Sequence, residues 1–179
     1  MAALDLPTIV TGELTLRPWT AADAPALVEA CGDEGICRFT TVPRRYSPEA
    51  AGEWLRRQAA HATAGSGIVL ALVPAAEAQP VGMIGLFGLD QHERAARLGY
   101  WLIARARGRG LATAGACALA RWGFETLALE TIYIDREPEN AASARVAAKL
   151  GTDPVGAREV RLRDGRSVSL IRHALRAAP

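Results

Sequence analysis

The stretch "RARGRGLATAG", from Arg105 to Gly115, places three arginines and two of its glycines just before a segment with helical periodicity. An apolar run of strand length, "LGYWLI", precedes it. Apolar and small residues then recur at helical spacing, namely Leu111, Ala114, Gly115, Ala118 and Trp122. We therefore predict a strand-to-helix turn whose composition is suited to holding an anion.

The physical reason lies in the main chain of such a turn. The first N–H groups of a helix have no partner within the helix, and the helix dipole adds partial positive charge there. Gly108 and Gly110 can adopt positive φ or leave room for a phosphate. Arg105, Arg107 and Arg109 add charge around the rim. The alternative interpretation is an ordinary left-handed turn with solvated arginines.

Two common phosphate-binding motifs do not match this turn. A nucleoside-triphosphate loop needs Gly-Lys followed by Ser or Thr, and no glycine of this chain is followed by that pair. A dinucleotide fingerprint needs a third glycine or alanine where Thr113 stands, within a parallel βαβ unit. Glu130 lies at a suitable distance downstream, but the strands predicted before the turn are antiparallel. Both motifs are excluded.

Periodicity and turn signals along the rest of the chain predict the order β, α, α, β, β, β, α, β, α, β, β. Thr20 and Ser47 are placed to cap helices, and Gly151 to end the last one. Residues 32–46 are predicted as a loop or broken helix, and Asp164-Gly165 as a hairpin turn. The other predicted helices cover 21–31, 48–64, a segment from 111 and 140–150. The predicted strands cover 13–19, 68–73, 81–89, 96–103, 131–137, 156–162 and 167–175.

Composition limits the possible classes of protein. A chain of 179 residues predicts a single domain over residues 1–179. The net charge of +2 and the few aromatic residues argue against nucleic-acid binding. The three cysteines lack metal-site or redox spacing, so we expect reduced thiols and no metal. We also expect no membrane association and a cytoplasmic location, since no long apolar stretch or leader is visible.

The turn and its surroundings resemble a known family. The segment "ARLGYWLIARARGRGLATAGACALARWGF" is similar to the signature of the GNAT superfamily of acyl-CoA-dependent N-acyltransferases. The pyrophosphate loop of that family reads Gln or Arg, two residues, Gly, one residue, and Gly or Ala. Arg105, Gly108 and Gly110 match these positions.

Two further motifs stand in the order the family requires. "PENAASARVAAKLG" resembles the second family motif, in which Asn140, Ser143, Leu150 and Gly151 match. "TGELTLRPWTAADAPAL" is similar to the opening of the RimJ/RimL branch, which acetylates protein N-termini, and of related enzymes that act on small amines. The resemblance runs from about Thr11 to the last hairpin, and three ordered motifs are far more specific than one loop.

The resemblance implies an α/β (α+β) fold of the GNAT type. We expect a mixed, mostly antiparallel sheet of about six to seven strands with about four helices, splayed between the fourth and fifth strands near Leu102 and Ile132. Acetyl-CoA would be the co-substrate, and the protein a monomer or homodimer. The residues implied to bind acetyl-CoA are Leu102, Ile103, Arg105, Arg107, Gly108, Arg109, Gly110, Leu111, Ala112, Asn140 and Ser143.

The resemblance also suggests catalytic roles. Ser143 is the candidate that protonates the departing thiolate, and an amide near Ile103 is the candidate that stabilises the oxyanion. Ser143 could instead bond back to a helix carbonyl. His92 and Glu93, in the turn before the fourth strand, are candidate bases. His61 and His173 are predicted to lie on the surface.

One position departs from the family pattern. Many members of the RimJ/RimL branch carry Glu two residues before the Gly-Tyr of the fourth strand, where this chain has Arg97. A catalytic role for that acid is therefore not expected here.

The predicted activity is acetyl-CoA-dependent acetylation of a primary amine, most simply the α-amine of a protein or peptide, by direct attack on the thioester. One alternative is a small-molecule acetyltransferase of the same fold that acts on an antibiotic or polyamine. A different class is a non-catalytic sensor that binds acyl-CoA. The sequence leaves open the acceptor, the acyl chain length, the use of a base and the oligomeric state.

Overall fold

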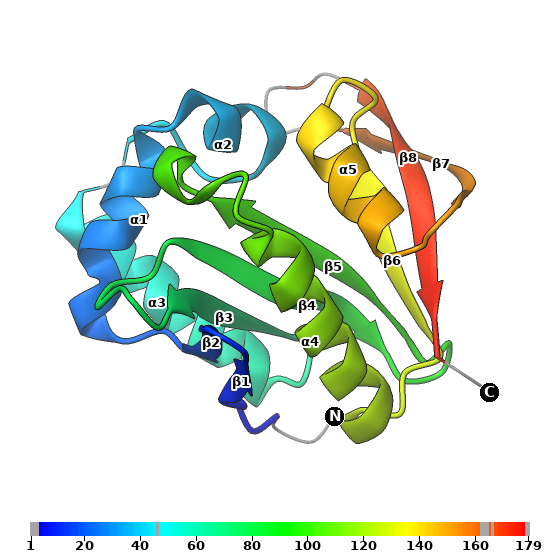
Figure 1. Ribbon diagram of the computed structural model, residues 1–179, viewed down its shortest axis with the longest axis horizontal. Coiled ribbons are helices and arrows are strands. Elements are labelled where there is room, and N and C mark those ends of the chain that lie inside the picture. Colours follow the sequence, from blue (N-terminus) through cyan, green and yellow to red (C-terminus); the bar gives the residue numbers. More distant parts are fainter. Residues whose placement is uncertain (1–3, 46, 162–164, 166, 178–179) are drawn as a thin grey trace.

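The computed structural model describes residues 4–45, 47–161, 165 and 167–177. One mixed sheet runs through these residues in the order β1-β2-β3-β4-β5-β6-β8-β7 (Figure 1). Only the β5–β6 pair is parallel, so the predicted mixed, mostly antiparallel sheet is confirmed. Its strands are β1 (Ile9–Thr11), β2 (Leu14–Pro18), β3 (Gly67–Pro74), β4 (Gly82–Asp90), β5 (Ala95–Leu102), β6 (Thr131–Arg136), β7 (Pro154–Arg161) and β8 (Ser167–Arg176).

Five α-helices cover this sheet in the described chain. In Figure 1, α4 and α5 lie in front of the sheet, while α3 lies behind it. The helices α1 and α2 pack with α3 around a second, smaller group of buried residues. The helices are α1 (Ala24–Cys31), α2 (Glu34–Phe39), α3 (Pro48–Thr63), α4 (Leu111–Thr126) and α5 (Ala141–Lys149), with short 3₁₀ turns η1 (Ala21–Asp23) and η2 (Ala104–Ala106).

The sheet is split between β5 and β6. These parallel strands pair only at their beginnings, and the last pair joins Arg97 to Tyr133. Beyond it the two halves of the sheet diverge towards the start of α4 (Figure 1). The split predicted near Leu102 and Ile132 therefore exists but begins deeper, because Ile132 still pairs with Ala96.

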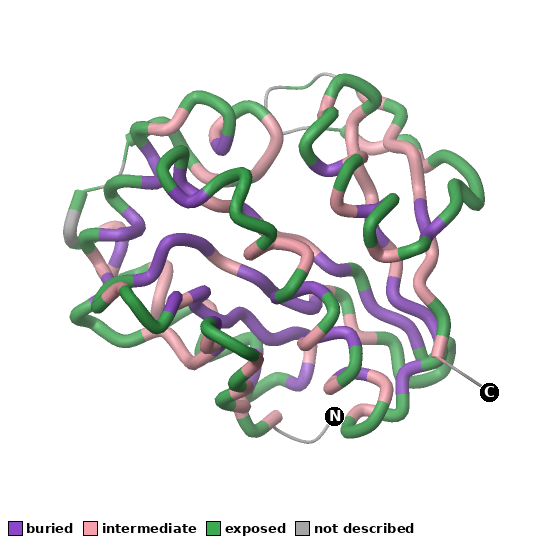
Figure 2. The backbone as a smooth tube through the Cα atoms, in the orientation of Figure 1, coloured by how far each residue is buried: buried purple, intermediate pink, exposed green. Residues whose placement is uncertain are grey.

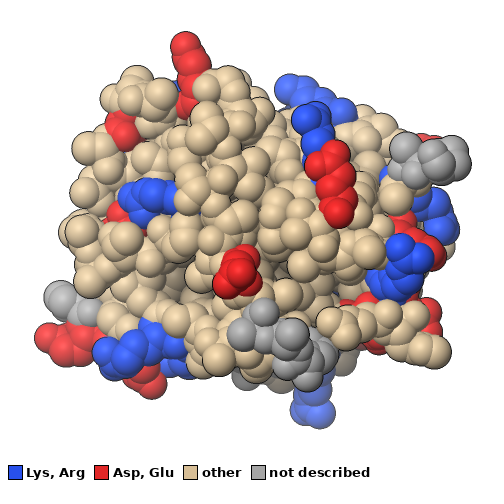
Figure 3. Space-filling model, turned by 90° about the horizontal axis from the view of Figure 1, so that it is seen from below, with Lys and Arg blue, Asp and Glu red and all other residues tan. Residues whose placement is uncertain are grey.

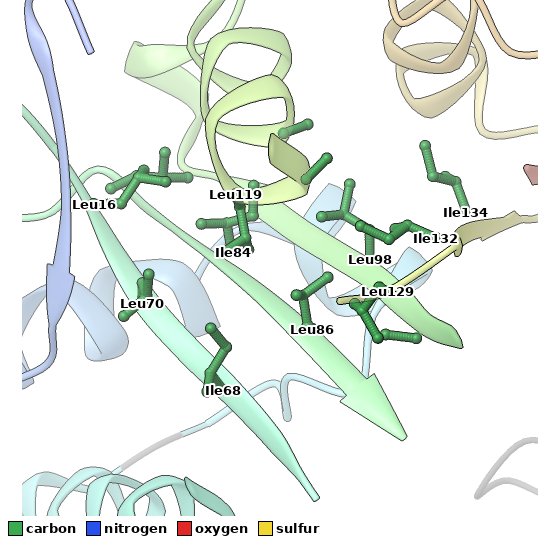
Figure 4. Packing of buried hydrophobic residues seen from close by; sticks show 14 of the residues in the cluster. Leu16, Ile68, Leu70, Ile84, Leu86, Leu98, Leu119, Leu129, Ile132 and Ile134 are labelled. Atoms are coloured by element: carbon green, nitrogen blue, oxygen red, sulfur yellow. The ribbon is translucent and has the colours of Figure 1, made fainter. Parts of the chain in front are cut away.

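The main core lies between the sheet and α4. Ile84, Leu86 and Leu98 from the central strands meet Leu119 of α4 (Figure 4), and the buried positions form a continuous band through the molecule (Figure 2). A Cβ at Gly115 would come within 2.8 Å of Leu72 Cδ2, so α4 packs closely on the strands as predicted.

Several local predictions need correction. The strand β1 was missed because three residues carry too little alternation to indicate a strand. The loop or broken helix predicted at 32–46 needs no correction, since it contains the short helix α2, separated from α1. In α4, Ala114 is exposed, and the buried face is Gly115, Ala116, Leu119, Ala120 and Gly123.

Other predictions concern single residues. Ser47 caps α3 by accepting a hydrogen bond from Ala50 N, and Gly151 adopts a φ of 69°, as predicted. Asp164 of the predicted hairpin turn lies outside the described residues. All three cysteines are free thiols, and burial raises the pKa of Cys31 to about 11.

A buried carboxylate fixes the start of the first helix. Asp23 is 1% exposed and accepts hydrogen bonds from both terminal nitrogens of Arg17, at 2.7 and 2.8 Å. It also accepts from the N–H and hydroxyl of Thr20, at 2.7 and 3.0 Å. Burial alone would raise the pKa of Asp23, but these hydrogen bonds and the charge of Arg17 lower it overall.

We predict that Asp23→Asn lowers the free energy of unfolding at pH 7 by about 2 kcal/mol, because charged hydrogen bonds are lost. A carboxylate with a lowered pKa stabilises the fold while it is ionised, and this stabilisation disappears on acidification. The difference between wild type and variant should therefore narrow below about pH 4. Urea unfolding between pH 7 and pH 3 measures it, with the exposed Asp153→Asn as control. A difference that stays constant across this range would contradict the prediction.

Candidate functional site

A large cleft of about 1510 Å³ extends along the split in the sheet. One wall comes from β5 and the start of α4, and the opposite wall from β6 and the start of α5. Its other end reaches α2, α3, the start of β3 and part of β4. Of the residues predicted to act in the site, those that line the cleft are Leu102, Arg107, Gly108, Gly110, Leu111, Ala112, Asn140 and Ser143.

The turn before α4 presents unused main-chain donors. Gly108 and Gly110 have φ values of 77° and 79°, which only glycine adopts without strain. A Cβ at either position would meet no atom within 4 Å, so the space above the turn is open. The first hydrogen bond of α4 joins Ala114 N to Gly110 O, and no described residue accepts from the N–H groups of residues 108–113. Together these amides form a cradle suited to an anion.

The arginines of the turn are held by carboxylates from other segments. Arg105 pairs with Glu29 and Glu77, and Arg109 pairs with Glu77 at 2.8 Å. The two arginines lower the pKa of Glu77 through their hydrogen bonds. Neither arginine lines the cleft. Their charge is therefore largely balanced, and the main-chain amides are the donors that remain for a ligand.

Arg107 connects the turn to α2. Its Nε donates to Leu102 O at 3.0 Å, and its Nη2 donates to Asp33 Oδ2 at 2.7 Å. The other carboxylate oxygen of Asp33 accepts from Ile36 N at 3.0 Å and so caps α2. Burial opposes ionisation of Asp33, but the bonds from Arg107 and Ile36 outweigh it and lower the pKa. One carboxylate thus serves both the turn and the helix.

Across the split, the start of α5 places a hydroxyl pair in the cleft. Asn140 caps α5 by accepting from Ser143 N at 3.0 Å. The Oγ of Ser143 lies 2.9 Å from the hydroxyl of Tyr100, which comes from β5. Ser143 is 8% exposed, and both residues line the cleft. The cap thus fixes the position of Ser143, and Ser143 contacts a tyrosine from the other side of the split.

Sequence reasoning missed Tyr100. Burial raises the pKa of its hydroxyl, and this effect outweighs the hydrogen bond to Ser143 and the nearby charge of Arg136. The hydroxyl therefore keeps its proton at neutral pH. A signal existed in the Gly-Tyr-Trp of the fourth predicted strand, but its partner lies 43 positions away and becomes adjacent only in the fold.

The oxyanion donor was predicted to be an amide near Ile103, and the amide of Ile103 itself is already occupied. Ile103 is 2% exposed, and its N–H donates to Val81 O at 3.0 Å. Because successive N–H groups of a strand point to opposite edges, those of Tyr100 and Leu102 point towards the split instead. These two amides are the donors available along the cleft wall of β5.

The candidate bases His92 and Glu93 lie outside the cleft, and one of the two other histidines is not where it was predicted. His92 and Glu93 are exposed in the β4–β5 turn, where their N–H groups donate to Asp90 Oδ1, and they do not line the cleft. Their placement gives no support to a role as bases. His61 is exposed as predicted, but the prediction for His173 was wrong, because it is buried and accepts from Arg136 Nε at 3.2 Å.

The far part of the cleft has an aromatic floor on the sheet face opposite α4, which we call the acceptor face. Gly85 and Gly99 pair across β4 and β5, and a Cβ on either would come within 3.0 Å of the Phe87 ring. The ring thus lies against these two glycines. Trp54 and Trp101 complete this end of the cleft.

Neither the charge on the face seen from below nor the metal-ligating side chains of the described residues indicate another site. Seen from below, acidic and basic side chains occur in small mixed groups on a largely uncharged face (Figure 3). Among the described residues, no group of three or more His, Cys, Asp and Glu could hold a metal ion. In the same residues, no helix is both long and apolar enough to span a membrane.

A split mixed sheet with an amide cradle at the head of its central helix is typical of the class of acyl-CoA-dependent acyltransferases. The family model described as "Acetyltransferase (GNAT) domain" matches residues 13–153. The chain belongs to this family and is an acetyltransferase, as its resemblance implied. Enzymes of the family use acetyl-CoA.

Two relatives from Bacillus subtilis (strain 168) are informative. The protein named "Putative ribosomal N-acetyltransferase YdaF" is 35% identical over 94 residues, which span 52% of this chain and 49% of that protein. The chain therefore matches only about half the length of YdaF. The "Uncharacterized N-acetyltransferase YoaA" is 27% identical over 150 residues, covering 84% of this chain and 85% of that protein.

A solved structure has the same fold. RimL, described as a "Ribosomal L7/L12 alpha-N-protein acetyltransferase" in complex with coenzyme A, aligns with a TM-score of 0.84. The alignment covers 95% of this chain and 98% of that chain, at 18% identity. The RimJ/RimL-like architecture that the sequence predicted is thus confirmed.

Proposed function

We propose that this enzyme transfers the acetyl group of acetyl-CoA to the α-amine at the N-terminus of a protein or peptide. The observation that carries the proposal is the set of free N–H groups at residues 108–113, at the mouth of the split in the sheet. The description of RimL as an α-N-protein acetyltransferase supports the acceptor class.

The residues around the cleft fit coenzyme A. The diphosphate would bind the amides from Gly108 to Ala112, where the open space and the helix dipole favour an anion. The N–H groups of Tyr100 and Leu102 on the edge of β5 can donate to an amide-bearing chain such as pantetheine. Acetyl-CoA, when bound, supplies an acetyl group activated as a thioester.

The acceptor face favours an amine that is already neutral. Glu53 pairs with Arg57 at 3.1 Å, and Asp135 binds Arg172 through two hydrogen bonds. Both carboxylates are therefore paired with arginines, and neither is poised as a base; Glu139, which also lines the cleft, stands next to the cap of α5. At pH 7 an α-amine is neutral about a tenth of the time, and a lysine side chain less than about a thousandth. The free energy needed to reach the neutral form therefore differs by about 3 kcal/mol between the two. An α-amine needs little help from a base.

The hydroxyl pair Tyr100–Ser143 would supply the proton for the departing thiolate. Tyrosine and thiols have similar reference pKa values, about 10 and 8.5, so a tyrosine is a suitable source. Its raised pKa keeps the proton on Tyr100, and the 2.9 Å contact allows Ser143 Oγ to pass it on. Asn140 holds the serine in place through the helix cap.

Free-thiol release with acetyl-CoA tests the proposal directly. Short peptides with a free N-terminus should give turnover, whereas the same peptides with a blocked N-terminus and an internal lysine should not. Mass spectrometry of the product locates the acetyl group. Turnover with a polyamine or aminoglycoside but with no peptide would instead identify a small-molecule acetyltransferase. Tight binding of acetyl-CoA without turnover of any amine would identify a sensor.

A further inference from the structure

Arg97 lies at the point where the two halves of the sheet part. It belongs to the last pair that joins β5 to β6. Strand alternation places it on the acceptor face with Gly99 and Trp101, and all three residues line the cleft. Its guanidinium lies beside the bulge in β4, where a Cβ on Gly88 would be 3.2 Å from Arg97 Nη2. Arg97 is therefore close to the closed end of the split.

Several other charged side chains of the acceptor face are already paired. Arg172 makes two hydrogen bonds to Asp135, at 2.7 and 2.8 Å, and Arg158 lies 3.6 Å from the same carboxylate. Glu53 is paired with Arg57 on α3. These groups comprise two carboxylates and three guanidiniums, so their net charge is already positive without Arg97.

Arg97 adds an unbalanced positive charge. Among the described residues it has no carboxylate within 4 Å, and the same is true of Arg45, which lines the cleft near α3. Arg45 and Arg97 thus lie at the same end of the cleft. The acceptor end of the cleft is therefore cationic.

The phosphates of coenzyme A do not account for this charge. The proposed cradle stands at the start of α4, which packs on the other face of the sheet with Leu98 and Leu119. Cationic side chains on that side, Arg145 and Lys149 of α5, also line the cleft and are available to those phosphates. Arg97 is thus available to the acceptor.

A guanidinium at this place has two effects on an acceptor. It lowers the pKa of an incoming ammonium group, because like charges disfavour the charged form, and so it favours the neutral nucleophile. It also attracts an anionic group on the same molecule and repels additional cations. An acceptor with several amines is disfavoured by the second effect.

We propose that Arg97 selects acceptors that carry a carboxylate or phosphate close to the reacting amine. In a peptide this group is the side chain of an acidic second residue; in a small molecule it is a phosphate or carboxylate beside the amine. The inference rests on the proposed acetylation of an amine and specifies the acceptor further.

Three peptides that differ only in their second residue test the inference. Alanyl-aspartyl, alanyl-asparaginyl and alanyl-lysyl peptides should follow this order in kcat/KM, with about tenfold between the first two at low salt. Calorimetric titration of each peptide into the protein saturated with CoA should give the same order of affinity. Arg97→Gln should bring the aspartyl and asparaginyl peptides to equal values in both measurements.

Two further variants sharpen the test. Arg97→Lys should keep part of the preference, since the charge remains. Arg121→Gln, on the exposed side of α4 and away from the cleft, should leave the preference and the affinity for CoA unchanged. A wild-type enzyme that acetylates all three peptides equally, or an Arg97→Gln variant that keeps the preference, would overturn the inference.

A further pair of acceptors separates this inference from the proposed function. If no peptide is acetylated, the peptide assignment fails, and phosphoethanolamine is compared with ethanolamine. Preference for phosphoethanolamine that is lost in Arg97→Gln would support the charge selection with a small acceptor. Equal use of the two, or preference for ethanolamine, would overturn it.

Discussion

Gly108→Asp is expected to weaken the binding of CoA by more than about 100-fold while the fold is retained. A Cβ at this position would meet no atom within 4 Å, so the side chain fits sterically. Its carboxylate would stand among the amides proposed to hold the diphosphate. Like charges about 5 Å apart at a partly exposed site repel by about 3 kcal/mol, which corresponds to that loss. Isothermal titration calorimetry with CoA measures the change.

Gly108→Asn is the matched control. It has nearly the same size and the same demand for positive φ, which asparagine tolerates better than most residues. It carries no charge. We expect it to weaken binding by less than about tenfold, and thermal unfolding should be similar for both variants. Equal affinities for the aspartate and asparagine variants would place the diphosphate elsewhere.

Ser143→Ala and Tyr100→Phe are each expected to lower kcat by about 100-fold, the size typical of losing a positioned proton donor. The two hydroxyls are 2.9 Å apart and act in one chain, so the double variant should be little worse than the more damaging single variant. The KM for acetyl-CoA should change little. Steady-state kinetics with a saturating acceptor separate these parameters.

Ser169→Ala, an exposed serine of β8, provides the control and should keep full activity. The pH profile adds an independent readout. If Tyr100 is the source of the proton, the decline of kcat at high pH should disappear in Tyr100→Phe. Additive losses in the double variant would show that the two hydroxyls do not act together.

Local signals were sufficient to predict much of the fold. The glycines at 108 and 110 indicated the turn before α4, and Asn140 followed by Ser143 indicated a capped helix, because these features depend on residues a few positions apart. The apolar strand-length segments indicated the order of the elements along the chain. The short strand β1 is set by pairing with β2, and three residues do not reveal such a partner.

The parts that were missed depend on distant neighbours. Tyr100 gains its role from a serine on another helix. Which amide near Ile103 faces the split could not be predicted, because it depends on the bond from Ile103 N to Val81 O beside the neighbouring strand. His173 stands in a strand with exposed stretches, and packing beside Thr152 buries it. Each of these results depends on contacts between segments that are far apart in the sequence. The spacing of residues along the chain does not reveal such contacts.

Asp33 has a consequence for redesign of this enzyme. Its two oxygens hold Arg107 on one side and the first turn of α2 on the other. A library that varies α2 in order to broaden the range of accepted amines would also loosen the loop proposed to hold the co-substrate, unless position 33 remains acidic. Directed evolution should keep this residue fixed and vary Phe39 and Thr40, which border the same cavity from the end of the helix.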